Sequence, residues 1–166
     1  MRLLLALLLS LALANPAMAA RHPACMKANV TLQKSATKKP NTKLLRLEIA
    51  ATPETREYGL MNRKNLVPCD GMAFFFPAIS QEPLAFANQK FWMKNTLIPL
   101  DILFLDANHT IIYIAHAKPL SLEPVGPNAP VATAIEIAGG RAKKDGINVG
   151  DKVTYELQTT PWQLAH

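Results

Sequence analysis

Residues 100–117, LDILFLDANHTIIYIAHA, decide the fold of this chain. Two apolar segments, 100–106 and 110–117, are joined by residues 106–109, DANH, whose composition is typical of a tight turn. Apolar segments joined in this way predict a β-hairpin. We therefore expect antiparallel strand pairing at the centre of the domain.

Further short segments extend the β pattern along the chain. Residues 44–51 alternate, so we expect Leu45, Leu47 and Ile49 to share one side of a strand. Other short apolar runs lie at residues 71–76 and 91–93, and residues 131–138 and 151–158 are also expected to form strands. Because no long helices alternate with these segments, the sequence predicts a mainly β fold, a compact antiparallel sandwich or barrel.

One short helix is expected after the first of these strands. Thr52 can cap its N-terminus, Pro53 suits the first helical position, and Glu54 places an acidic side chain in the first turn. Gly59 is expected to end the helix. Residues 139–146 predict only a turn or a short helical piece.

The first twenty residues have the organisation of a secretory signal peptide. Arg2 precedes an apolar run at 3–14, and small residues follow, so we expect cleavage after Ala19 or Ala20. The apolar run is too short to span a bilayer as a helix, which needs about 20 residues. We therefore expect a periplasmic or secreted protein with no transmembrane segment after cleavage.

The net charge of +6 is unevenly distributed along the chain. Residues 21–46 carry seven basic and no acidic side chains, whereas residues 47–166 carry ten basic and twelve acidic ones. The basic charge thus lies outside the apolar-rich domain, which argues against nucleic acid as a partner. The expected organisation has four parts: a signal peptide at 1–20, a basic lead-in at 21–43, one β-rich domain at 44–158 and a tail at 159–166.

The two cysteines, Cys25 and Cys69, are expected to form a disulfide bond. Export would place them in an oxidising compartment, where a pair is more often bridged than free. A redox or metal-binding pair is the alternative, but the chain has no C-x-x-C spacing. The bond would tie the lead-in segment to the domain.

The candidate site residues are polar side chains next to apolar ones. Arg56, Arg63, Lys94 and Asn95 are expected to cluster around the helix, its exit loop and the loop after Phe91. They would supply donors to a ligand, and no cofactor or metal is expected. Familiar nucleotide-binding, metalloprotease and serine-hydrolase motifs do not occur in the sequence.

Two carboxylates, Asp101 and Glu136, interrupt otherwise apolar strands. One interpretation is structural, in which Arg56, Arg63 or backbone donors satisfy them. The other places both carboxylates in one cleft with Trp92 as an aromatic platform and Lys94 on its rim. The sequence leaves both interpretations open.

Three segments, TxxxRxxGLMxR at 52–63, GMxFxF at 71–76 and FWMKNTxxPLDIxF at 91–104, resemble the secreted bacterial and archaeal family called domain of unknown function 192. The resemblance covers about residues 44–158. It implies a β-rich sandwich similar to a jelly roll with a short helix, and no particular activity. Its motif positions are Arg56, Gly59, Met61, Arg63, Gly71, Met72, Trp92, Met93, Lys94, Asn95, Pro99, Asp101 and Glu136.

Three functions are compatible with these residues. The first is a non-catalytic binding or accessory module of the cell envelope for a small polar or anionic ligand or envelope component. The second is a glycan-directed hydrolase that uses Asp101 and Glu136 as acid and base. The third is a Cu(I) site built from Met61, Met72 and Met93, whose simpler interpretation is core filling.

Overall fold

The structure, a computed structural model, describes residues 25–32, 41–78 and 86–156. The expected signal peptide, the tail at 159–166 and part of the basic lead-in at 21–43 lie outside the described residues. No helix in the described part of the chain is long and apolar enough to cross a membrane. The elements are β1 (Met26–Leu32), β2 (Asn41–Ala50), α1 (Pro53–Tyr58), β3 (Gly71–Phe75), β4 (Leu100–Leu105), β5 (Ile111–Ala117), β6 (Thr133–Ala138), α2 (Arg141–Asp145) and β7 (Lys152–Glu156).

The seven strands form one sheet in the order β5-β4-β6-β3-β2-β1-β7. The expected hairpin is confirmed as β4 and β5, which pair antiparallel. One expectation needs correction, because β2 and β3 pair in parallel. Parallel neighbours require a crossover connection, and α1 with the loop that follows it supplies this connection.

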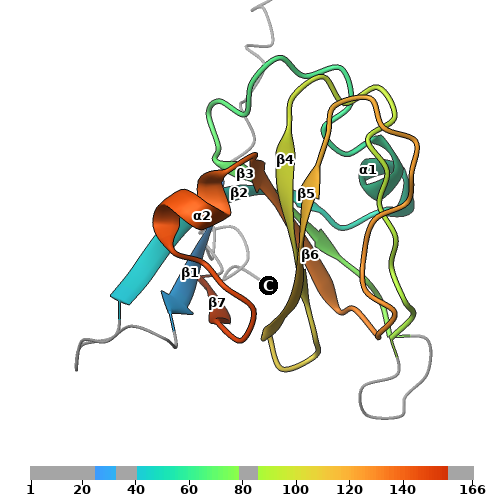
Figure 1. Cartoon of the computed structure of the whole chain (residues 1–166). Helices are drawn as coiled ribbons and strands as arrows, with labels where there is room; N and C mark the ends of the chain where they lie inside the picture. Colours follow the sequence, from blue (N-terminus) through green and yellow to red (C-terminus); the bar gives the residue numbers. More distant parts are fainter. Residues whose placement is uncertain (1–24, 33–40, 79–85, 157–166) are drawn as a thin grey trace, which may run out of the picture.

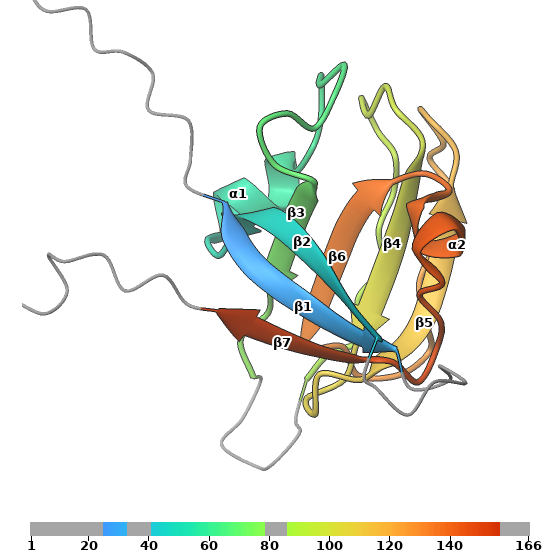
Figure 2. The same cartoon turned by 90° about the vertical axis from the view of Figure 1, so that its left-hand side faces the viewer.

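The sheet curls into a half-barrel (Figures 1 and 2). Its two edge strands approach each other at one end, where Thr110 forms an isolated bridge with Lys152. There the backbone N–H of Ile111 donates to the carbonyl of Asp151 at 2.9 Å. The mainly β prediction is therefore confirmed in its barrel form, with a second short helix, α2, beside the sheet.

The central strands are buried on both faces, so the sheet separates two apolar clusters. In β4, Leu103 belongs to the cluster inside the curl, whereas its neighbours Ile102 and Phe104 belong to the cluster on the outer face. The inner cluster also takes residues from β1, β7 and α2. Leu60, which follows α1, and the segments around Met93 and Val131 cover the outer one.

β2 passes from one cluster to the other. Leu45 and Leu47 are fully buried in the inner cluster, as expected, but Ile49 is 47% exposed. Glu48 and Ala50, on the opposite side of the strand, are buried instead. The alternation in the sequence therefore holds only for the first half of the strand, because the packed face changes at Glu48.

The predicted helix start and end are confirmed in α1. The Thr52 side chain accepts a hydrogen bond from the backbone N–H of Thr55, and the Thr55 side chain accepts one from the backbone N–H of Thr52. Gly59 ends the helix with a φ of 50°. A Cβ at Gly59 would also lie 3.3 Å from the Phe74 ring. Both the positive φ and this close contact therefore disfavour a side chain at this position.

The expected lead-in at residues 21–43 contains a strand, β1, that was not predicted from the sequence. β1 pairs with both β2 and β7, and Met26, Ala28 and Val30 contribute to the inner cluster. Intervening basic and polar residues, such as Lys27 and Asn29, obscured this short alternation. Part of the basic stretch is thus integral to the sheet.

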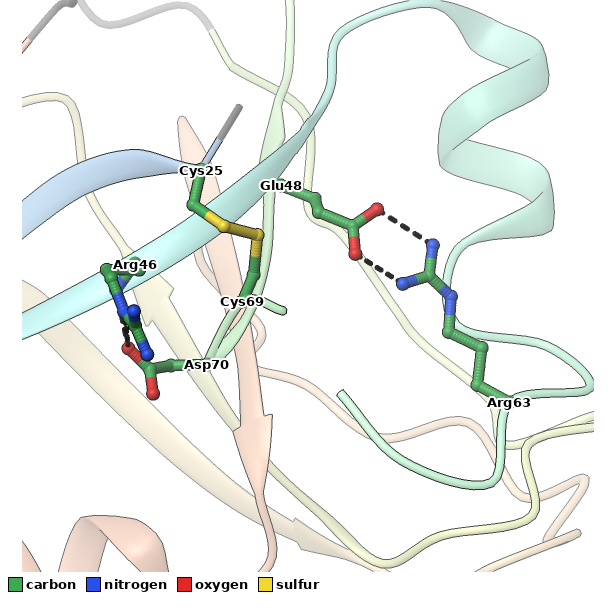
Figure 3. Close-up of a disulfide and its surroundings, with 6 residues drawn as sticks. All are labelled: Cys25, Arg46, Glu48, Arg63, Cys69 and Asp70. Carbon is green, nitrogen blue, oxygen red and sulfur yellow. Dashed lines mark hydrogen bonds and ion pairs between the residues drawn. A yellow bond between two sulfur atoms is a disulfide. The ribbon is translucent and has the colours of Figure 1, made fainter. Parts of the chain in front are cut away.

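The expected disulfide bond is present between Cys25 and Cys69, whose Cα atoms are 5.7 Å apart (Figure 3). It joins the start of β1 to the residues that lead into β3. Next to it, the Asp70 carboxylate accepts a hydrogen bond from the Arg46 backbone N–H at 2.9 Å. The bond therefore fastens β1 to the crossover.

Replacing Cys25 and Cys69 together by serine should lower the free energy of unfolding by about 4 kcal/mol, because the bond closes a loop of about 45 residues in the unfolded chain. Urea unfolding of the oxidised protein and the variant measures the difference. Wild-type protein under reducing conditions should match the variant. Equal midpoints for the oxidised protein and the variant would show that the bond contributes nothing.

Candidate functional site

A hollow of about 510 Å³ lies on the outer face of the sheet, beside α1. Its lining comes from α1 and the residues after it, from the end of β3, from residues 89–92 and from Thr96 and Glu136. The walls are largely aromatic. Phe74 packs edge-on against Phe91 with ring centroids 5.0 Å apart, and Phe76 packs against the same ring at 6.3 Å.

The Glu136 side chain lines this hollow from β6 in the sheet. In the register, Glu136 lies between Met72 of β3 and Ile102 of β4, both of which belong to the outer cluster. Only 5% of the residue is exposed. No hydrogen bond or ion pair joins its carboxyl to another residue in the described ranges.

Burial raises the pKa of Glu136 to about 8, and the positive charge of Arg63 opposes this rise only in part. A carboxyl group with such a pKa is largely protonated and neutral at pH 7. It can then both donate and accept a hydrogen bond. Among the predicted site residues, Glu136 is therefore a carboxyl group whose burial shifts its pKa strongly, as is common at functional sites.

Arg56 lines the same hollow, but much of its donor capacity is used within the protein. Its guanidinium donates to the carbonyl oxygens of Ala51 and of Phe75 and lies 5.9 Å from the centroid of the Phe76 ring. These contacts hold α1 against the end of β3. Arg56 thus forms part of the wall of the hollow.

Arg63 forms an ion pair with Glu48, as Figure 3 shows. The guanidinium makes two hydrogen bonds to the carboxylate, of which one measures 2.8 Å, and these bonds raise the pKa of Arg63 above its ordinary value. Glu48 is 7% exposed, so the charge of Arg63 is committed to it. The structural interpretation holds for Arg63, although its partner is neither of the carboxylates that we expected.

Trp92 connects the hollow to a smaller neighbouring one of about 260 Å³. Lys94 and Asn95 line only the smaller hollow, and the Lys94 ammonium lies 5.1 Å from the centroid of the Trp92 ring. Asn95 has a φ of 55°, and its backbone carbonyl accepts a hydrogen bond from the backbone N–H of Asn62 at 2.8 Å. Asn95 thus shapes the turn that carries these residues.

Asp101 lies on the opposite face of the sheet from Glu136. It is opposite Ile137, a residue of the inner cluster, whereas Glu136 is opposite Ile102 of the outer one. One Asp101 oxygen accepts the backbone N–H of Ala142 in α2 at 2.8 Å, and the other lies 2.7 Å from Nδ1 of His116. The two carboxylates therefore do not share a cleft, because adjacent residues of a strand point to opposite faces.

The methionines follow the simpler interpretation of core filling. Met72 and Met93 are buried in the outer cluster, and Met61 lines the hollow. Within the described part of the chain, no group of three or more histidine, cysteine or acidic residues could hold a metal ion. The apolar packing of Met72 and Met93 therefore favours core filling over a Cu(I) site for these two methionines.

The family model DUF192, described as "Uncharacterized ACR", matches residues 34–155. This chain belongs to the DUF192 family. The predicted resemblance to domain of unknown function 192 is therefore confirmed. No curated protein matches the chain significantly.

Two solved structures are similar to this DUF192 protein. One, from Sinorhizobium meliloti, is described as a "putative transcription regulator"; it is 31% identical, with 81% of this chain and 96% of that chain covered and a TM-score of 0.67. The other, a protein of unknown function from Novosphingobium aromaticivorans, is 32% identical, with coverages of 81% and 94% and a TM-score of 0.65. Both likenesses support the fold.

Neither the aromatic walls of the hollow nor the partner of Arg63 was predicted from the sequence. Phe74 and Phe76 are two residues apart, and this spacing in a strand would have placed both on one face. The alternation at residues 44–51 places Glu48 on the side opposite Leu45 and Leu47, yet Glu48 is buried. No local signal indicated that the packed face changes at this residue.

Replacing Arg63 by Leu should lower the free energy of unfolding by about 3 kcal/mol, because it leaves the buried Glu48 carboxylate without a partner. Urea unfolding measures the loss, with replacement of the exposed Lys64 by Ala as the control. A double variant, Arg63→Leu with Glu48→Gln, should recover part of the stability. Equal losses in the single and double variants would contradict the pairing.

Glu136 should make stability depend on pH. Because its pKa is raised to about 8 in the folded state, the folded protein keeps a proton that the unfolded chain loses above about pH 4.5. Relative to a Glu136→Gln variant, the wild-type free energy of unfolding should therefore fall by about 1.4 kcal/mol per pH unit between about pH 5 and 8. Urea unfolding across this range measures both proteins, and parallel curves would contradict the raised pKa.

Proposed function

We propose that this DUF192 protein is an exported, non-catalytic binding module that holds a small polar molecule in the hollow beside α1. The observation that carries the proposal is the Glu136 carboxyl, which is nearly buried, opens only into the hollow and makes no hydrogen bond to another described residue. Leaving a buried polar group unpaired costs free energy. A ligand that hydrogen-bonds to Glu136 offsets this cost, so the site favours an occupant.

The form of the hollow supports a small ligand. Its volume of about 510 Å³ is within the usual range for small-molecule sites, about 300–1,000 Å³. Such sites combine apolar walls with a few polar groups that orient the ligand. Here aromatic rings form the walls, and Arg56, Tyr58 and Lys90 add polar groups.

The charged residues of the hollow favour a polar ligand over an anionic one. Arg56 donates to backbone carbonyls, and the Lys90 ammonium donates to the Gly126 carbonyl and the Asn128 side chain. Arg63, the third cation near Glu136, is paired with Glu48. An anion would therefore compete with protein oxygens for its donors.

Binding is favoured over glycan hydrolysis because the expected pair of carboxylates is not together. Asp101 caps α2 on the other face of the sheet, where it also contacts His116. Glycoside hydrolysis needs two carboxyl groups about 5–9.5 Å apart on either side of the scissile bond. Asp101 and Glu136 point away from each other.

Export and a place in the cell envelope are part of the proposal. The organisation of residues 1–20 supports it, as does the Cys25–Cys69 bond, since disulfides persist in oxidising compartments. A small envelope component or a solute of the periplasm is then within reach of the hollow.

We expect a small molecule to co-purify with the protein from a periplasmic extract. Trp92→Ala should weaken binding of that molecule by at least about tenfold, because the Trp92 ring forms one side of the hollow. Mass spectrometry of the extracted protein identifies and quantifies that molecule. Since Trp92 is 49% exposed, its loss should leave the unfolding midpoint nearly unchanged. Tyr113→Ala, which removes a comparably exposed ring outside the hollow, is the control, and equal retention by both variants would contradict the proposed site.

A further inference from the structure

We infer that the hollow takes a small organic cation, an ammonium compound whose positive charge lies against the Glu136 carboxyl among the aromatic rings. The inference rests on the proposed function, and it assigns the chemical class of the ligand. It depends on three features of the hollow. Glu136 has no hydrogen-bond partner among the described residues, and the nearby arginine and lysine side chains bind other protein oxygens. Aromatic rings line the hollow.

The first feature is the acid itself. Glu136 is 5% exposed, lines the hollow, and has no hydrogen-bond partner in the described ranges. A neutral hydrogen-bond donor would satisfy it only in part. A cation offsets the negative charge of a buried carboxylate, which a neutral hydrogen-bond donor does not.

The second feature is the arrangement of the protein's own cations. Arg63 lies close enough to lower the pKa of Glu136, yet its guanidinium makes two hydrogen bonds to Glu48. Arg56 and Lys90 line the hollow and donate to backbone carbonyls. The protein therefore places positive charge near Glu136 without forming an ion pair with it.

The third feature is the aromatic wall. Phe74, Phe76, Phe91, Trp92 and Tyr58 all line the hollow. Aromatic rings attract organic cations through their electron-rich faces, and cages of such rings bind quaternary ammonium groups. Within this protein, Lys94 already lies over Trp92 and Arg56 over Phe76, so these rings are placed to contact cations.

Further charge at the rim favours the same ligand class. Glu57 of α1 lines both the hollow and its smaller neighbour, and Glu54 lines the neighbour. These exposed carboxylates would attract a cation toward the opening. The other titratable groups near Glu136 in the described part of the chain are Arg56, Tyr58, Lys90, Lys94, Arg63 and Glu48, which pairs with Arg63 and lies opposite Met72 in the register.

Binding of a cation should be linked to release of a proton. Near pH 7 the Glu136 carboxyl is largely protonated, because burial raises its pKa to about 8. When the ammonium group binds, the carboxyl O–H bond breaks, the electron pair stays on the carboxylate and the proton passes to solvent. Affinity should therefore rise roughly tenfold per pH unit below about pH 8 and level off above it.

Choline chloride is a suitable probe because its charge does not change with pH. Titration calorimetry gives the Kd at pH 6, 7 and 8, and the Trp92 indole N–H signal in a Trp162→Phe background reports where the probe binds. We expect Glu136→Gln to weaken binding at least about tenfold and to remove the pH dependence. Glu57→Gln, at the exposed rim, should change the Kd only two- to threefold.

The matched probes are 3,3-dimethyl-1-butanol, which has the shape of choline without its charge, and sodium acetate. Choline binding that depends on Glu136 and on pH supports the inference. Binding of the neutral alcohol as tight as that of choline, or binding of acetate alone at Trp92, overturns the inference and leaves the proposed binding function intact. If no probe shifts the Trp92 signal, the cation inference fails, and the co-purified molecule decides the proposed function separately.

Discussion

The burial of the central strands on both faces is the constraint on which the rest of this structure depends. β3, β4 and β6 lie between two apolar clusters, so almost every side chain on them must be apolar or must have a partner. Two carboxylates nevertheless lie on these strands. Asp101 meets the requirement through the Ala142 backbone and His116, whereas Glu136 has no such partner among residues 25–32, 41–78 and 86–156 and opens into the hollow. This difference separates a structural acid from a candidate binding group.

An ion pair, side-chain hydrogen bonds and a disulfide bond hold the segments that form the walls around Glu136. The Arg63–Glu48 pair ties the loop after α1 to β2, and Arg56 ties α1 to the end of β3. The disulfide between Cys25 and Cys69 holds the start of β1 to the residues before β3. In this arrangement the charged residues of the motif segments build the hollow, and the aromatic residues form its surface.

Much of the fold could be predicted from local patterns, because strands, caps and turns depend on neighbouring residues. The hairpin at 100–117, the capped start of α1 and its end at Gly59 are examples. The parallel pairing of β2 with β3 and the strand at Met26–Leu32 could not be predicted, since they depend on contacts between distant segments. For the site, the sequence indicated Glu136 and Trp92, but it could not separate Asp101 from Glu136. That separation required the strand register, which places them on opposite faces.

The proposed site depends most on Glu136, a nearly buried carboxyl group that opens into the hollow without a hydrogen-bond partner among the described residues. Carbon-13 NMR of the glutamate side-chain carboxyl carbons, with Glu136→Gln to assign the signal, measures its ionisation directly. The Glu136 signal should titrate near pH 8 in the free protein, well above the other glutamates. Titration at the ordinary value near 4.5 would show that the group is solvated or already paired, and would contradict the account.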